Sequence, residues 1–267
     1  MMIATVSTAT IRGRRQAWRQ AGRGHGIVLL HDICVDATAW RAQFADLARD
    51  HRVIAWDCPG YGESAPLSPK EPTVADYAAA LDDLLATIHA ERVALIGAGL
   101  GAVIAAAAAK SRPARTAALV LVSAPSRIGG GQAARMLGWL QQRITDPAAF
   151  GRAYAAEALS PGTVGGIRDE VGALAAAIPP QGFARACHMM AGTDLAATLH
   201  DLQVSVLLIY GERDGLTPPE TGTALDTIVR GTVTEIVEGA GHLPQMEAPA
   251  PFNRAVRTFL RSARTRM

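Results

Sequence analysis

The stretch ALIGAGLGAVIA, Ala94 to Ala105, decides the fold of this chain. Its first residues are apolar and end at a glycine, as in a short buried β-strand. Glycines then occupy every second position, at Gly97, Gly99 and Gly101, and an alanine-rich run typical of a helix follows. We therefore predict a strand, a tight turn with Gly99 at its apex, and a helix that begins at Leu100.

Apolar runs of the same kind recur on both sides of this unit. They are Gly26–Leu30, His51–Asp57, Arg92–Gly97, Ala117–Ser123, Val204–Gly211 and Thr232–Gly239. Ile3–Ala9 and Arg14–Gln20, joined by Arg12-Gly13, have the pattern of a leading hairpin. Continuous apolar runs of this length are typical of strands that are buried on both faces of a parallel sheet.

Helical patterns separate these runs. They are Trp40–Ala48, Val74–Ile88, Leu100–Ser111, Glu220–Val229 and Pro251–Ser262. Alternating strands and helices predict right-handed βαβ units. The expected fold class is therefore α/β, with a doubly wound, mostly parallel sheet.

One region breaks the alternation. Residues 126–201 contain helical patterns, such as GQAARMLGWLQQRI and PQGFARACHMMAG, and no convincing strand. We expect an all-helical insertion there that lies as a lid over a core built from residues 1–125 and 202–267. Its apolar faces need the core to cover them, so it is not expected to fold as a separate unit.

Composition excludes several classes of protein. The formal charge is only +2 and the basic residues gather near the two ends, which argues against nucleic-acid binding. Three scattered cysteines, Cys34, Cys58 and Cys187, form neither a disulfide framework nor a metal site. No secretory signal or membrane span is visible. We expect a cytoplasmic monomer or homodimer with no cofactor and no metal, whose partner is a small-molecule substrate.

The glycine turn has the spacing of G-x-S-x-G, in which a strained turn presents a nucleophilic serine above the sheet. Here Gly99 occupies the serine position. A dinucleotide-binding loop is the other interpretation of a glycine-rich turn before a helix. That pattern fails because Ala102 stands at its third glycine and because several strands precede this turn.

Two further motifs decide between these interpretations. Asp214, in IYGERDGLTPPE, follows one predicted strand, and His242, in EGAGHLPQMEAP, follows the next. Each residue alone is explained as an ordinary turn or loop residue. The chain order turn, acid, base is nevertheless that of a catalytic triad on an α/β sheet, in which the carboxylate orients an imidazole that moves a proton.

The chain resembles the α/β-hydrolase superfamily over essentially its whole length, and within it the 3-oxoadipate enol-lactonase type of small-molecule hydrolase. The segments that carry the resemblance are His31 with Trp40, DCPGYGES at 57–64, the glycine turn, GERDGLTPP and GAGH. The resemblance implies an oxyanion hole formed by the N–H groups of Leu100 and Ile33. It also implies a substrate pocket between the turn and the insertion.

Candidate pocket residues come from the loop after the first core strand and from the insertion. They are His31, Asp32, Trp139, Met136, Met189, Met190 and Phe183, with Arg135 and Arg185 as possible partners of a substrate carboxylate. Most of the apolar ones are equally explained as packing of the insertion on the core. Asp32 departs from the family pattern, because it stands where the resemblance implies a glycine and brings a negative charge to the oxyanion loop.

Three outcomes follow from glycine at the serine position. In the first, the missing CH₂OH leaves a vacant spot for about one water, and His242 with Asp214 activates that water or takes a proton from a small ester, lactone or carbonyl substrate. Such a protein is a direct hydrolase, lyase or cyclase. In the second, it is an inactive homologue that binds a small molecule or a protein partner. In the third, Gly99 was introduced to trap a ligand, against which Asp32 argues. Cys34 lies close to the oxyanion loop and is the only cysteine that is a candidate to replace the serine, although free cysteines more often pack in the core.

Overall fold

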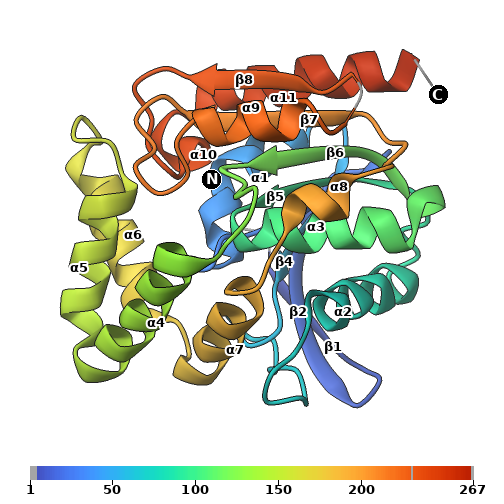
Figure 1. Cartoon of the computed structure of the whole chain (residues 1–267). Helices are drawn as coiled ribbons and strands as arrows, with labels where there is room; N and C mark the ends of the chain where they lie inside the picture. Colours follow the sequence, from blue (N-terminus) through green and yellow to red (C-terminus); the bar gives the residue numbers. More distant parts are fainter. Residues whose placement is uncertain (1–4, 230, 266–267) are drawn as a thin grey trace.

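The computed structural model describes residues 5–229 and 231–265 and contains one eight-stranded sheet (Figure 1). Its strands are β1 (Val6–Ile11), β2 (Arg14–Ala21), β3 (Gly26–Leu30), β4 (Arg52–Asp57), β5 (Val93–Ala98), β6 (Thr116–Val122), β7 (Val206–Gly211) and β8 (Val233–Val237). They lie in the order β1-β2-β4-β3-β5-β6-β7-β8. Among the pairs that these described strands make, only β1–β2 and β2–β4 are antiparallel. The predicted α/β class with a mostly parallel sheet is confirmed.

The leading hairpin forms as the sequence predicts. Arg12 and Gly13 make its turn, with φ of +48° and +76° respectively, and β2 continues the sheet by pairing with β4. The first two residues of the predicted strand, 3 and 4, lie outside the described part of the chain.

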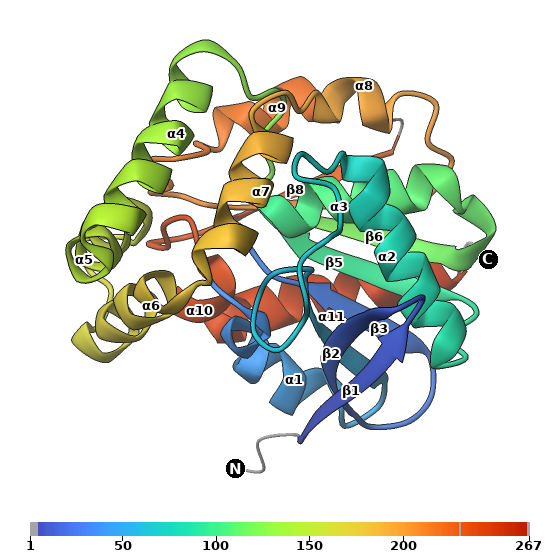
Figure 2. The ribbon, with the colours of Figure 1, turned by 90° about the horizontal axis from the view of Figure 1, so that it is seen from below.

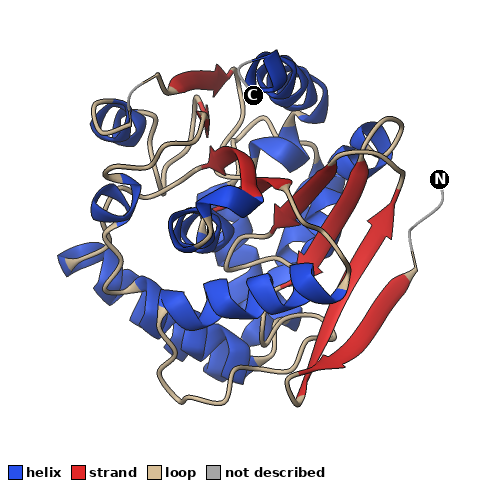
Figure 3. Ribbon diagram, turned by 90° about the vertical axis from the view of Figure 1, so that its right-hand side faces the viewer, coloured by secondary structure: helices blue, strands red, loops and turns tan. Residues whose placement is uncertain are grey.

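Helices cover both faces of the sheet (Figure 3). The helices α1 (Arg41–Leu47) and α11 (Pro249–Thr265) pack on one face, and α2 (Val74–Thr87) and α3 (Leu100–Ser111) pack on the other. Every residue of the central strand β5 is buried. The short elements η1 (Ala37–Trp40), η2 (Pro113–Arg115), α9 (Glu220–Asp226) and α10 (Pro244–Glu247) lie in the connections.

The chain between β6 and β7 is helical. It forms α4 (Gly130–Thr145), α5 (Pro147–Ala158), α6 (Gly165–Ala177), α7 (Pro180–Met190) and α8 (Leu195–Leu199). Figures 1 and 2 show α4 to α7 grouped beside one end of the sheet, the end where the parallel strands run into their following loops. The domain boundary and the action of this segment as a lid stay predictions.

Within residues 5–229 and 231–265, no helix combines the length and the apolar character that a membrane span needs. The expected cytoplasmic location and oligomeric state stay predictions.

Candidate functional site

The turn between β5 and α3 is shaped by close backbone packing. Gly99 has φ of +47° and ψ of −106°, a backbone conformation that residues other than glycine rarely adopt. A Cβ at Gly97 would lie 2.2 Å from the carbonyl oxygen of Gly101, and a Cβ at Gly101 would lie 2.2 Å from that of Leu30. These glycines therefore let α3 start directly above β5 and beside β3, and they place the N–H of Leu100 at the carboxyl end of the sheet.

Asp214 lies three residues beyond β7 and its carboxylate is fixed by its own turn. Oδ1 accepts hydrogen bonds from the N–H groups of Leu216 and Thr217, both at 2.9 Å, and Oδ2 accepts one from the Thr217 hydroxyl at 2.8 Å. The carboxylate is buried. A carboxylate held by these donors can only present its remaining lone pairs toward the neighbouring imidazole.

His242 lies between β8 and α10, where its main chain is clamped from two sides. Its N–H donates to the carbonyl oxygen of Ala158 at 2.7 Å, and its carbonyl accepts from the Ser123 hydroxyl at 2.8 Å. Its Nδ1 lies 3.0 and 2.9 Å from the two carboxylate oxygens of Asp214. The structure therefore brings together the predicted acid and base, and the helical insertion helps to position the base through Ala158.

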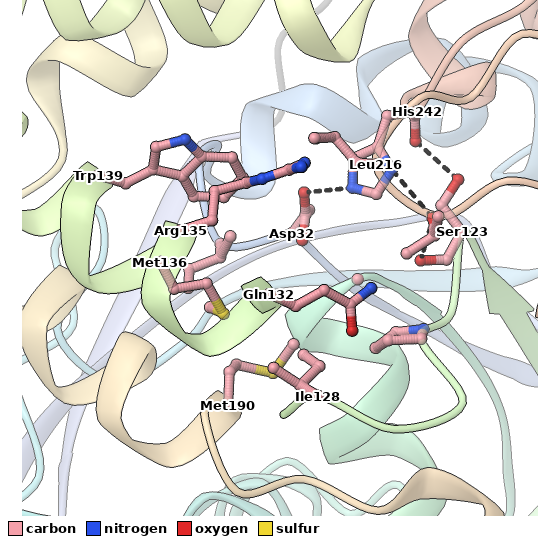
Figure 4. Close-up of a pocket in the computed structure, with 14 residues that line it drawn as sticks. Asp32, Ser123, Ile128, Gln132, Arg135, Met136, Trp139, Met190, Leu216 and His242 are labelled. Carbon is pink, nitrogen blue, oxygen red and sulfur yellow. Dashed lines mark hydrogen bonds and ion pairs between the residues drawn. The ribbon is translucent and has the colours of Figure 1, made fainter. Parts of the chain in front are cut away.

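The carboxylate of Asp32 lies on the other side of the same imidazole (Figure 4). Its Oδ2 is 3.3 Å from His242 Nε2 and accepts a hydrogen bond from the Tyr154 hydroxyl at 3.1 Å. Its Oδ1 accepts from the N–H of Leu100 at 3.0 Å, and the N–H of Ile33 also helps to lower the pKa of this carboxyl group. Both N–H groups predicted to form an oxyanion hole therefore act on a carboxylate of the protein itself.

The prediction of a vacant spot beside Gly99 is wrong. A Cβ at position 99 would lie 1.8 Å from Asp32 Oδ1, so the space expected to hold a water is filled by the Asp32 side chain. The reason is geometric, because Asp32 follows β3, next to β5, and its side chain reaches over the apex of the turn. Two departures from the family pattern in the sequence could have indicated this arrangement. One is a carboxylate at Asp32, where the pattern has glycine, and the other is Gly99, where the pattern has serine.

The three ionisable groups stabilise one another's charged forms. Burial alone would lower the pKa of His242, but the charges and hydrogen bonds of Asp214 and Asp32 raise this pKa well above its ordinary value. Burial alone would raise the pKa of both carboxyl groups, but the imidazolium and the backbone N–H donors lower both. The site at neutral pH is thus an imidazolium between two carboxylates, with a net charge of about −1.

Tyr154, from α5, completes this cluster. Its hydroxyl is buried, and burial together with the negative charge of Asp32 raises its pKa well above the ordinary value. The hydroxyl therefore stays protonated and donates a hydrogen bond to Asp32 Oδ2. Sequence reasoning missed Tyr154, since nothing in its local pattern distinguishes it from a residue that packs α5 on the core.

A cavity of about 70 Å³ opens above this cluster, which is room for a few waters or a small organic group. Its walls are mostly apolar and come largely from α4 and the loops around the cluster. The lining residues are Asp32, Ile33, Gly99, Ser123, Pro125, Ile128, Gln132, Arg135, Met136, Trp139, Met190, Leu216, Thr217 and His242. Figure 4 shows that Gln132, Arg135, Met136 and Trp139 project from one helix toward the cavity.

Several of the other predicted pocket residues lie elsewhere. Met189 and Phe183 are buried in the hydrophobic core rather than in the cavity wall. His31 is also buried, with Nε2 accepting the N–H of Cys58 at 3.0 Å and Nδ1 donating to the carbonyl oxygen of Asp32 at 2.8 Å. It therefore holds the loop that carries Asp32 and leaves no nitrogen for a substrate.

Cys34 is fully buried, and burial raises the pKa of its thiol well above the ordinary value. A neutral thiol is a poor nucleophile, and Cys34 does not line the cavity. This disfavours the hypothesis that Cys34 replaces the serine. Across the described ranges of the chain, no group of three or more His, Cys, Asp or Glu side chains is arranged to hold a metal ion.

Comparisons with known proteins agree with this architecture. The chain matches the model of the alpha/beta hydrolase family over residues 27–255. An uncharacterized protein of Mycobacterium tuberculosis is 29% identical over 280 residues, covering 96% of this chain and 81% of the relative. A pimeloyl-[acyl-carrier protein] methyl ester esterase of Aliivibrio fischeri is 27% identical over 253 residues, covering 91% and 96%.

Solved structures with the same fold include an esterase and an enol-lactonase. A thermophilic esterase from Thermogutta terrifontis has a TM-score of 0.89 at 25% identity, with 97% of this chain and 99% of that chain covered. An enol-lactonase from Burkholderia xenovorans has a TM-score of 0.88 at 21% identity, with 95% and 99% covered. The match to the family model covers most of the chain, and this chain belongs to the alpha/beta hydrolase family.

Proposed function

We propose that this protein is an enzyme that acts on a small ester, lactone or carbonyl compound without forming an acyl-enzyme on a serine. The observation that carries the proposal is the buried imidazole of His242, held by Asp214 on Nδ1 and facing Asp32 with Nε2 at the floor of an apolar cavity. A residue with so strongly shifted a pKa in a pocket is a candidate for proton transfer. Gly99 at the apex of the turn excludes a serine nucleophile there.

His242 begins the reaction as a proton donor in this proposal. The two carboxylates favour the imidazolium, so its first step is donation to a substrate oxygen through Nε2. The neutral imidazole that remains then acts as the base toward water or an acidic C–H bond. The sequence interpretation, in which His242 with Asp214 starts as a base, therefore changes in order, while the proton-transfer role stays.

One observation favours the alternative, a homologue that binds a small molecule or protein partner without turnover. The N–H of Leu100 is already bonded to Asp32, so a substrate oxyanion has no free donor at that place. An active protein must then lower its barrier mainly through proton transfer and orientation. The two functions differ in whether His242 affects turnover or only affinity.

The experiment compares the wild type with His242→Ala and Asp214→Asn on p-nitrophenyl esters, enol lactones and β-keto acids. The proposal expects turnover of at least one class that falls by about 10³-fold or more in both variants. Thermal unfolding checks that the variants fold. Calorimetric binding without turnover in the wild type supports the alternative, and turnover that survives both substitutions overturns the proposed role of His242.

A further inference from the structure

We infer that Asp32 is itself a nucleophile, whose carboxylate forms a covalent ester with a saturated carbon of a small epoxide before water releases the product. The inference goes beyond the proposed substrates and rests on the proposed function only in using His242 to move protons. The N–H of Leu100, which is expected to hold the oxygen of a substrate carbonyl, instead donates a hydrogen bond to a carboxylate of the protein.

The position of the two Asp32 oxygens divides their roles. Oδ1 accepts a hydrogen bond from the N–H of Leu100, while Oδ2 faces His242 and Tyr154. When Oδ2 carries a substrate carbon, Oδ1 becomes the carbonyl oxygen of an ester that already lies against the Leu100 N–H. Attack of water on Cγ then develops negative charge on Oδ1, the atom that this donor stabilises.

Asp32 meets the requirements of a carboxylate nucleophile. It lines the cavity, and the imidazolium and backbone donors keep its carboxyl group ionised at neutral pH. Gly99 contributes by lacking a Cβ, which would collide with Oδ1. The carboxylate therefore takes the space that a serine at the turn would need.

The two proton donors beside Oδ2, His242 and Tyr154, suit an epoxide as the substrate. Opening an epoxide places a developing alkoxide one carbon away from the attacked carbon, so this oxygen stays close to the nucleophile. His242 Nε2 and the Tyr154 hydroxyl lie 3.3 and 3.1 Å from Oδ2 and are the groups able to protonate or bind it. The apolar wall formed by Met136, Trp139 and Met190 suits the hydrocarbon part of a small epoxide.

The steps balance in atoms and electrons. Asp32 Oδ2 forms a bond to a ring carbon, the ring C–O bond breaks with its electron pair on oxygen, and that oxygen takes the proton of His242 Nε2. Neutral His242 then takes a proton from water as the water oxygen bonds to Cγ. The tetrahedral intermediate breaks its Cγ–Oδ2 bond, and the leaving oxygen takes the proton of the new hydroxyl. Epoxide and water become a vicinal diol, and the carboxylate and imidazolium are restored.

The first test looks for the ester, with epoxybutane and styrene oxide as probes. We expect His242→Gln, which cannot activate water but leaves the Tyr154 hydroxyl able to protonate the opened oxygen, to gain the mass of one probe molecule on the peptide that contains Asp32. Adding Asp32→Asn to His242→Gln should abolish the adduct. Adding Asp36→Asn to His242→Gln is the matched control, because Asp36 lies on the same loop, caps η1 and is absent from the cavity wall, so the adduct should still form.

The second test is a single turnover of the wild type in water enriched in the heavy oxygen isotope. The covalent route gives an unlabelled diol in the first turnover and places the label in the Asp32 carboxylate. A labelled diol without an adduct overturns the covalent role and leaves direct water activation by His242. No adduct and no diol with either probe overturns the inference, while His242-dependent turnover of an ester or lactone would still support the proposed function.

Discussion

The two ring nitrogens of His242 face carboxylates that come from different parts of the chain. On the Nδ1 side, Asp214 is held by the backbone of its own turn, and the pair follows the chain order of a triad. On the Nε2 side, where a nucleophile would receive or give a proton, the chain places Asp32 over Gly99. In this chain the acid–base half of a triad is therefore present, while the other half of the site is built from a different loop.

The rebuilt side depends on a coupled pair of residues. The Asp32 carboxylate and a Cβ at position 99 cannot occupy the same space, since they would lie 1.8 Å apart. Each departure alone resembles damage to an active site, whereas together they make a buried, hydrogen-bonded arrangement.

Reversing both changes should have the largest effect. We expect Asp32→Gly with Gly99→Ser to gain esterase activity on p-nitrophenyl acetate of about 10³-fold over the wild type, because a hydroxyl then faces His242 and both N–H donors become free. The measurement is steady-state release of nitrophenol with a test for a burst and for fluorophosphonate labelling.

The control for this gain is Gly99→Ser alone. With Asp32 in place the new side chain lacks space, so this variant should gain no esterase activity over the wild type and should be less stable than it. Equal activity in the single and double variants would show that the two positions are independent.

Adding only a Cβ at position 99 should destabilise the fold. Gly99→Ala combines the contact with Asp32 and an unfavourable backbone conformation, so we expect the free energy of unfolding to fall by about 3 kcal/mol. Asp32→Gly should recover part of that loss in the double variant. Gly138→Ala is the matched control, because a Cβ there meets nothing within 4 Å in the middle of α4, and it should be neutral or stabilising. Denaturant unfolding measures all three.

The charged cluster predicts how stability depends on pH. The carboxyl groups of Asp32 and Asp214 have pKa values lowered from 3.8, so their contribution is present above pH 3.8 and is lost as the pH falls through the lowered values. His242 has a pKa raised from 6.5, so its contribution is complete below pH 6.5 and is lost as the pH rises through the raised value.

The cluster should therefore stabilise the fold most between pH 3.8 and 6.5. Thermal unfolding across pH, compared between the wild type and Asp32→Asn, measures this effect. The alkaline decrease should be smaller in Asp32→Asn, because His242 then keeps only one carboxylate. An identical alkaline limb in the two proteins would contradict the charge assignment of the Nε2 side.

The smallest effect is expected at Tyr154. Removing its hydroxyl in Tyr154→Phe deletes a hydrogen bond to a buried carboxylate and should lower the free energy of unfolding by about 2 kcal/mol. Tyr61→Phe, which deletes a hydrogen bond to the neutral carbonyl of Ile33, should cost only about 1 kcal/mol. Equal losses in the free energy of unfolding for the two substitutions would show that Tyr154 does not donate a hydrogen bond to an ionised Asp32.

Local patterns were enough to predict most of the fold. The turn at Gly99 follows from its glycine spacing, and the leading hairpin follows from Arg12-Gly13 between two β-rich runs. The short helix α10 was not predicted, because its four residues are too few to show the helical periodicity of apolar residues. Trp139 and Met190 line the cavity whereas Met189 does not, because helical spacing alone does not tell which face of a helix meets a pocket.

The α/β fold, the turn at Gly99 and the order of Asp214 and His242 follow from the amino-acid sequence, because period, glycine spacing and chain order are local or one-dimensional properties. In contrast, the placement of Asp32 in the space at Gly99 and the hydrogen bond from Tyr154 to Asp32 become visible only in the folded chain. These contacts join residues far apart in the chain, and they depend on where the loop after β3 and the helix α5 meet above the sheet.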